Sequence, residues 1–123
     1  MQNNTTTQNK SKIASENTLN VLINALEDAK ALKIKVLDVT HLTAITDAMI
    51  ICTGTSSRHM RHIAETALKA ASEAGLNIIS SEGLDSQDWI IVDAADAIVH
   101  VMSEQAREFY NLEGLWDMSA LAE

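Results

Sequence analysis

The nearly unbroken apolar run AMIICT at residues 48–53 constrains the fold more than any other part of this chain. Because no polar side chain recurs at every second position, a strand formed by this run needs cover on both faces. Gly54 ends the run, and Thr55, Ser56 and Ser57 then supply side-chain oxygens suited to capping a helix. The pattern predicts a central strand that leads directly into a helix.

Two stretches repeat apolar residues at the spacing of one helical face. The stretch that follows the serines carries this stripe at Met60, Ile63, Ala64, Ala67, Leu68 and Ala71. Gly75 fits the position just past the end of that helix, where a left-handed backbone is common. Nearer the N-terminus we expect a first helix at residues 16–31, capped by Ser15, with its stripe at Leu19, Leu22, Ile23 and Leu26.

Shorter segments complete the predicted order. We expect strands at residues 34–39, 76–80, 89–92 and 97–102, an acidic loop at 82–88, a short helix from Ser103 to Tyr110 and a final segment at 112–121. Strands joined by tight turns pair antiparallel, whereas a connection through the long helix allows a parallel pair. The predicted fold class is α/β at the border with α+β, a single domain whose mixed five-stranded sheet is packed with helices.

The chain divides into three parts by composition. We expect a disordered polar tail at residues 1–15, a folded domain at 16–118 and a C-terminal extension at 119–123. The single cysteine, Cys52, excludes an internal disulfide and fits a reducing compartment. No apolar run approaches the roughly 20 residues of a membrane span, and no apolar signal segment stands near the N-terminus. We therefore expect a cytoplasmic protein with no membrane partner.

Charge separates the two halves of the chain. Residues 1–70 carry eight basic and six acidic residues, or +2, and residues 71–123 carry one basic and eleven acidic residues, or −10, which together give the net charge of −8. An acidic half repels nucleic-acid phosphates and anionic lipid, and it suits a partner with a basic protein surface. Simple solubility is the alternative explanation.

All four aromatic residues, Trp89, Phe109, Tyr110 and Trp116, fall in the acidic half. Tryptophan and tyrosine dominate binding hot spots, but most aromatic side chains in proteins belong to the core. We expect Phe109 and Trp116 to be core residues. For Trp89 and Tyr110 the core and an interface remain equal alternatives.

The motifs for catalysis are weak. The turn at Gly54 lacks the Gly-Lys-Ser/Thr of a phosphate-binding loop, so a tight turn with a helix cap is expected there. We expect Cys52 to pack in the core and His100 to be a buried, satisfied histidine. Asp93 and Asp96 flank a hairpin turn, where aspartate is common. No nucleophile has an evident partner in the sequence.

His59 and His62 lie three residues apart on the predicted second helix, which places both near one face with Arg58 and Arg61. We expect a small basic face there, because two histidines do not complete a metal site that needs about four ligands. Three hypotheses follow from the residues alone. The chain is a binding module, a small nucleotidyltransferase that uses the Gly54 loop, or a regulator that binds metal or phosphate through these side chains.

Four sequence blocks resemble the ribosome silencing factor (Iojap) family. They are Thr46-Asp47 leading into MIICTGTSSRH, then DWIIVD at 88–93, DAIVHV at 96–101, and REFYNLE at 107–113 with Leu115-Trp116. The blocks stand in the family's order and spacing over about residues 17–116. The resemblance implies a fold related to nucleotidyltransferases and a protein that is not known for catalysis.

The resemblance also implies a partner. Family members bind protein number fourteen of the large ribosomal subunit on the face that meets the small subunit, which blocks subunit joining and lowers translation when nutrients are scarce. Trp89 and Tyr110 match the family's partner-facing tryptophan and tyrosine. We expect the partner-binding set to be Trp89, Tyr110, Asp88, Glu82, Arg107 and Glu108. We expect no cofactor, no metal and no direct nucleic-acid specificity, and we allow for a homodimer off the ribosome.

Overall fold

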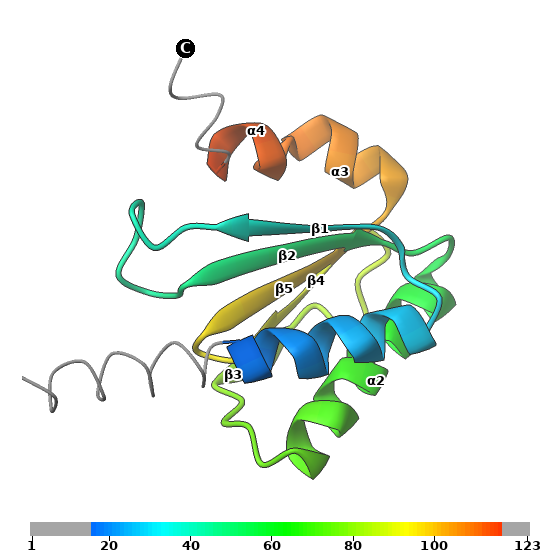
Figure 1. Ribbon diagram of the computed structural model, residues 1–123. Helices are drawn as coiled ribbons and strands as arrows, with labels where there is room; N and C mark the ends of the chain where they lie inside the picture. The colour runs from blue at the N-terminus through cyan, green and yellow to red at the C-terminus, as the bar shows by residue number, and fades with distance from the viewer. Residues whose placement is uncertain (1–15, 117–123) are drawn as a thin grey trace, which may run out of the picture.

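Five strands form one mixed sheet in the order β1-β2-β5-β4-β3 in the computed structural model, which describes residues 16–116 (Figure 1). The strands are β1 Leu32–Asp38, β2 Ala48–Thr53, β3 Ser80–Glu82, β4 Trp89–Asp93 and β5 Ala97–Met102. β2 and β5 run parallel, and the connection between them passes through the long helix α2, Ser57–Glu73. Within the described sheet the neighbouring strands otherwise pair antiparallel. The predicted mixed five-stranded sheet is confirmed.

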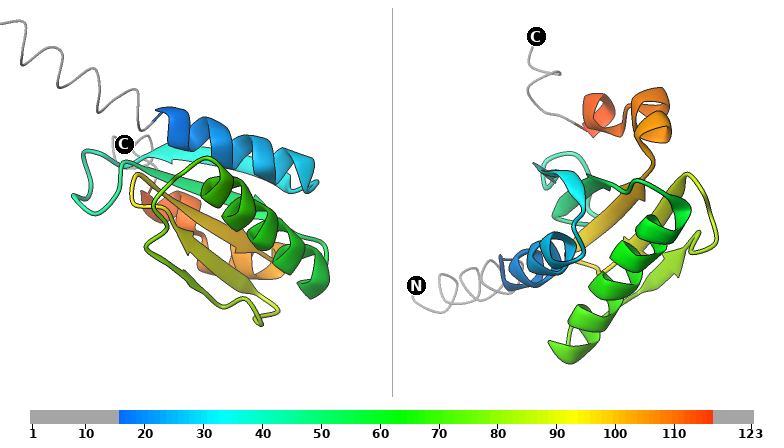
Figure 2. Two further views of the ribbon diagram at one scale, coloured as in Figure 1. Left: turned by 90° about the horizontal axis from the view of Figure 1, so that it is seen from below. Right: turned by 90° about the vertical axis from the view of Figure 1, so that its right-hand side faces the viewer.

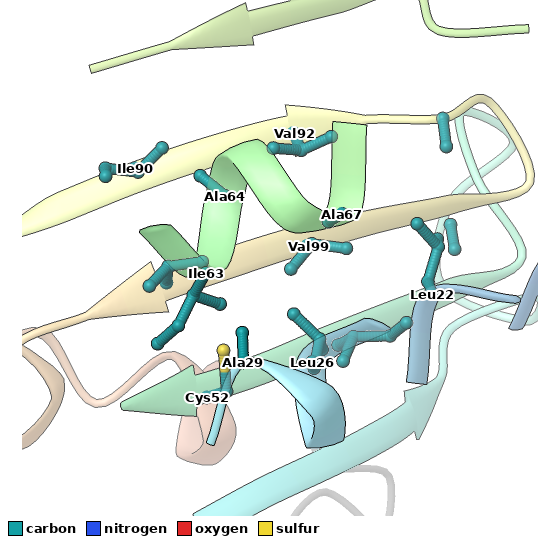
Figure 3. Close-up of a cluster of buried hydrophobic side chains, with 14 of the residues drawn as sticks. Leu22, Leu26, Ala29, Cys52, Ile63, Ala64, Ala67, Ile90, Val92 and Val99 are labelled. Atoms are coloured by element: carbon teal, nitrogen blue, oxygen red, sulfur yellow. The ribbon is translucent and has the colours of Figure 1, made fainter. Parts of the chain in front are cut away.

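One face of the sheet is covered by α2 and by an N-terminal helix over residues 16–28 (Figures 1 and 2). The core between these layers joins helix residues to the alternate residues of β2, β4 and β5 that point toward them (Figure 3). Its members include Leu22, Leu26, Cys52, Ile63, Ile90, Val92 and Val99. Cys52 is fully buried, as expected, and burial raises the pKa of its thiol to about 12.

Two short helices, α3 at Glu104–Tyr110 and α4 at Leu112–Trp116, lie on the other face of the sheet (Figure 2). Beneath them is a second apolar cluster of Leu37, Val39, Met49, Ile51, Met102 and Ala106, with Trp89 and Leu112 partly buried against it. All six residues of β2 are therefore buried, as the AMIICT run predicts.

The caps predicted for α2 and α3 are confirmed. The side chain of Ser56 accepts a hydrogen bond from His59 N at 3.0 Å, and that of Ser103 accepts one from Ala106 N at 3.1 Å. At the end of α2, Gly75 adopts φ +74°, and two backbone hydrogen bonds close the last turn around it. These ends set the directions in which α2 and α3 leave the sheet.

Three predicted boundaries are wrong. The strand expected at 34–39 is β1, which begins two residues earlier and ends one residue earlier, at Leu32–Asp38. The first helix ends at residue 28 rather than 31, because Lys30 adopts a left-handed φ of 66° and Ala31 N donates to Leu26 O, a Schellman end without glycine. The strand predicted at 76–80 is the three-residue β3, and it takes in Glu82, which was assigned to the acidic loop. Leu76 and Ile78 instead pack against the first core as an irregular connection.

Several predictions fall outside the described residues. They concern the tail at 1–15, the cap at Ser15 and everything past residue 116, including the rest of the segment 112–121, the domain end at 118 and the extension at 119–123. Among the helices of residues 16–116, none is long and apolar enough to cross a membrane.

Candidate functional site

Trp89 opens β4 and is clamped between the sheet and α3. Its indole Nε1 donates to Nδ1 of His100 at 3.0 Å, and its ring centroid lies 5.0 Å from that of Tyr110 at an angle of 45°. The indole is half-buried against the second core cluster. One side of Trp89 therefore packs in the core and the other faces solvent. The residue combines the core role and the surface role that the sequence left as alternatives.

Tyr110 and Phe109 end α3 and are both exposed, with 53% and 80% of their surface open to solvent. Their rings meet edge to face at 5.0 Å. Phe109 was expected in the core, and this prediction is wrong, because the helix turns position 106 toward the sheet and leaves position 109 outside. Trp116 was also expected in the core, and its side chain lies outside what the structure describes.

We use the name aromatic platform for Trp89, Phe109 and Tyr110 together with Ile91, which lies two residues along β4 on the same face of the sheet. Glu82 on the edge strand β3 is paired with Ile91, so its side chain stands on this face too. Asp88 precedes Trp89 and is exposed. Two carboxylates therefore flank the platform along its β3–β4 side.

Asp88 also ties the platform to α3. Its backbone oxygen accepts from Ser103 N at 2.9 Å, and its carboxylate accepts from the Ser103 hydroxyl at 3.4 Å. Because Ser103 caps α3, this pair of bonds couples the start of β4 to the start of the helix that carries Tyr110. Asp88 is therefore both a charge beside the platform and part of its support.

Glu108 and Arg107 lie on a different side of α3 from Tyr110. Glu108 lines an open groove of about 500 Å³ with Lys33, Thr53, Glu104, Arg107, Asn111 and Glu113. Arg107 is largely buried there, where it forms an ion pair with Glu113 and donates to the hydroxyl of Thr53 at 3.0 Å. The structure thus brings Trp89 and Tyr110 into contact, with Asp88 next to Trp89 and Glu82 on the same face of the sheet. It places Arg107 and Glu108 in a groove on another side of the helix.

His100 lies beneath the platform and is only 6% exposed. Its Nδ1 accepts from Trp89, and its Nε2 lies 3.1 Å from the sulfur of Met49. Removal from solvent lowers the pKa of the imidazole to about 4, so the ring is neutral at physiological pH. The prediction of a buried, satisfied histidine is confirmed.

The Gly54 loop is a turn with a helix cap, as predicted. Gly54 N donates to Met102 O at 3.1 Å, and Thr55 N donates to His59 Nδ1 at 2.9 Å, so these two amide groups are engaged within the chain. A Cβ on Gly54 would lie 2.5 Å from the Met60 Cγ, which explains the glycine by the close approach of α2. The open groove beside the loop is lined by the carboxylates of Asp88 and Glu104.

His59 and His62 do not share one surface, and that prediction is wrong. His59 is half-buried, and its Nε2 lies 2.9 Å from Ala29 O at the end of the N-terminal helix. His62 is exposed and lines a shallow groove with Arg58 and Arg61. Within residues 16–116, no group of three or more His, Cys, Asp or Glu side chains is arranged to hold a metal ion.

A family model described as "Ribosomal silencing factor during starvation" matches residues 12–123. The chain belongs to this family of ribosomal silencing factors. The ribosomal silencing factor RsfS of Haemophilus influenzae is 44% identical over 95 residues, which cover 77% of this chain and 93% of that protein. A crystal structure of a Chromobacterium violaceum protein superposes with a TM-score of 0.80 at 40% identity, over 82% of this chain and 84% of that one.

A more distant relative is the mouse protein named "Mitochondrial assembly of ribosomal large subunit protein 1". It is 30% identical over 103 residues, which cover 81% of this chain and 45% of the mouse protein. The recognition of the silencing factor family from the four sequence blocks is thus confirmed. The implied relation to nucleotidyltransferases stays a prediction.

In this silencing factor the sequence did not reveal how His100, Phe109 and Ile91 relate to the site. His100 and Ile91 are cross-strand partners on β5 and β4, nine residues apart in a part of the sequence that is mostly apolar. Only the alternation along those strands, with odd and even positions on opposite faces, could have grouped Trp89 with Ile91. Phe109 carried no signal, since a lone phenylalanine in a short helix usually packs inward.

Proposed function

We propose that this protein binds the large ribosomal subunit through ribosomal protein number fourteen and thereby prevents the small subunit from joining. Translation then falls when nutrients are limiting. The protein acts by binding and not by catalysis, and the aromatic platform is its contact surface. Its place of action is the cytoplasm.

The observation that carries this proposal is the exposed aromatic pair of Tyr110 and Phe109 beside the half-buried Trp89. Large aromatic rings on a surface lose contact with water when a partner covers them, which yields much of the affinity of a typical interface. The indole of Trp89 is held by His100 on the sheet and by Tyr110 on a capped helix, so little of its side-chain freedom is lost on docking.

Charge supports a basic partner. Glu82 and Asp88 lie beside the platform, and Glu108 lies on another side of α3. The whole of residues 71–123 carries −10. Such a field speeds the encounter with a positively charged protein surface, whereas the contact of the aromatic rings governs how long the complex lasts.

Arg107 has a supporting role in the proposal. Its guanidinium joins α3 to Glu113 of α4 and to Thr53 at the end of β2. These contacts hold the helix that carries Tyr110. Because the guanidinium is largely buried and bonded within the chain, we expect Arg107 to support the surface rather than to contact the partner. The names of the relatives agree with the proposal, since they refer to silencing of ribosomes and, in the mouse protein, to the large subunit.

Co-sedimentation tests the proposal. The purified chain is mixed with isolated large or small ribosomal subunits, run on a density gradient at low salt, and then tested for its effect on the association of the two subunits. We expect the chain to travel with the large subunit alone and to reduce the amount of joined ribosome. A chain that stays at the top of the gradient would contradict the proposal.

The variants Trp89→Ala and Tyr110→Ala test the surface itself. Ile45→Ala is the matched control. Ile45 is 77% exposed and lies in the loop before β2, whereas Trp89 pairs with Met102 of β5, which in turn pairs with Thr53 at the other end of β2. We expect the two platform variants to lose co-sedimentation and the control to keep it. Retained binding in both platform variants, with an intact fold, would refute the site assignment.

A further inference from the structure

The bond between Trp89 and His100 assigns a polar role to an otherwise apolar part of the sheet. Trp89 is paired directly with Met102, so His100 is its diagonal neighbour on β5. Diagonal neighbours on one face of a sheet are within reach of aromatic side chains. The indole reaches along this diagonal to His100, while Tyr110 packs against it from α3.

The bond also dictates the state of the imidazole. An indole N–H can only donate, so Nδ1 of His100 must be the acceptor and must carry no proton. The other nitrogen, Nε2, faces the sulfur of Met49, a weak acceptor. A single neutral tautomer therefore satisfies both contacts, and the indole has one preferred orientation over the sheet.

We propose that His100 is a positioning residue for partner binding, which holds the indole of Trp89 in its binding orientation and satisfies its N–H before the partner arrives. The inference rests on the proposed function, because it concerns the surface through which the protein binds. His100 is buried beneath Trp89 and makes no contact with the partner itself.

The satisfied N–H matters most when the partner covers the platform. A buried donor without an acceptor is costly, and a partner that buries Trp89 would otherwise have to supply an acceptor at the right place. With His100 beneath it, the indole can be covered by any apolar surface of suitable shape. The held orientation also reduces the side-chain freedom that docking removes.

Three substitutions of His100 separate positioning from packing. His100→Leu removes the acceptor and keeps an apolar side chain of similar size. His100→Asn keeps an acceptor oxygen two bonds from Cβ, where Nδ1 stands, and it removes the rest of the ring. His100→Gln keeps the amide but moves its oxygen one bond further from the backbone, and it serves as the acceptor-displacing variant should the leucine variant fail to fold. Ile51→Val is the matched control, because Ile51 is a buried neighbour of His100 on the same face and does not touch Trp89's N–H.

Two measurements are made on the full chain. The first is the dissociation rate from purified large ribosomal subunits. The second is the exchange with water of the Trp89 indole proton in nuclear magnetic resonance spectra, assigned with a Trp116→Phe variant. We expect His100→Leu and His100→Gln to raise the dissociation rate about ten-fold and to speed indole exchange, whereas His100→Asn and Ile51→Val stay within about three-fold of the wild type.

The outcomes distinguish the two levels of the argument. If Trp89→Ala weakens binding but a folded His100→Leu variant dissociates as the wild type does, the positioning role is refuted and the proposed function stands. If His100→Asn fails as badly as His100→Leu, the histidine acts through packing and the inference is likewise refuted. If Trp89→Ala itself binds normally, the proposed surface is wrong, and the positioning role of His100 in partner binding is refuted with it.

Discussion

Arg107 and Glu113 form an ion pair that joins α3 to α4 across the turn at Asn111. The two side chains are only 13% and 28% exposed, and Arg107 also donates to Thr53 at the end of β2. The left-handed backbone of Asn111, with φ 48°, turns the chain so that the two charges meet. One guanidinium thus connects both short helices to the central strand.

Removal of Glu113 tests this connection. Glu113→Ala leaves the guanidinium of Arg107 largely buried without its counter-charge, so we expect the free energy of unfolding to fall by about 1–3 kcal/mol. Urea denaturation measures the change. Glu108→Ala is the control, since this glutamate of the same helix is exposed, and its stability effect should stay within about 0.5 kcal/mol. Equal midpoints for both variants would show that the pair adds nothing.

The stability of the protein should fall in acid because of His100. Its pKa is about 4 in the folded chain, below the ordinary value of 6.5 for a histidine in an unfolded chain, so the unfolded chain binds the proton more readily between these values. Stability is then present in full above pH 6.5 and is lost as the pH falls toward 4, by about 2–3 kcal/mol at pH 4.5. Urea titrations at pH 7 and pH 4.5 measure this loss.

His100→Asn is the comparison that isolates the histidine. Protonation of carboxylates such as Asp38, whose pKa is lowered by hydrogen bonds from Thr40, also destabilises the fold in acid. This effect is the same in the wild type and in the variant. The asparagine variant should therefore lose less stability than the wild type between the two pH values. A loss of the same size in both would contradict the burial of a neutral imidazole.

Substitution of Gly54 should strain the joint between β2 and α2. A Cβ there would lie 2.5 Å from Met60 Cγ and 3.1 Å from the Met60 backbone, so we expect Gly54→Ala to lower the free energy of unfolding by about 1–3 kcal/mol. Gly75→Ala meets no atom within 4 Å and carries only the cost of its left-handed backbone, about 1 kcal/mol. Thermal unfolding measures both, and a Gly54→Ala variant no less stable than Gly75→Ala would speak against the close packing.

Binding to the large subunit should weaken as salt rises, because the partner-facing charges attract across solvent. The triple variant with Glu82→Gln, Asp88→Asn and Glu108→Gln should show a shallower dependence of affinity on salt. A matched triple variant, with Glu27→Gln, Asp28→Asn and Glu73→Gln, removes the same charge from exposed helix positions on the other side of the sheet. Equal salt dependence in the two variants would mean that net charge, and not the platform, steers binding.

Cys52 should be inert in the folded protein. It is fully buried, and the raised pKa of its thiol leaves almost no thiolate at neutral pH. We expect no reaction with an aromatic disulfide reagent at pH 8 until the chain is unfolded in urea, when one thiol reacts. Rapid labelling of the folded chain would show that the core opens around β2.

The local features of the fold could be predicted from the sequence by itself. The buried β2, the caps at Ser56 and Ser103, the end of α2 at Gly75 and the β4–β5 hairpin each depend on residues a few positions apart. Propensity, capping and turn chemistry act over that range, so the signal is complete within each segment. The same local blocks also carried the family resemblance.

The arrangement of the platform was decided only by the tertiary structure. One row of paired residues crosses all five strands, from Glu82 through Ile91, His100 and Ile51 to Lys35. Neither the strand order nor the register that forms this row can be predicted from any one segment of the sequence. The left-handed turn at Lys30, which ends the first helix, and the exposure of Phe109 were missed for a related reason. Packing against distant elements can impose a left-handed backbone or leave a large apolar side chain in solvent, against the local preference of the residue.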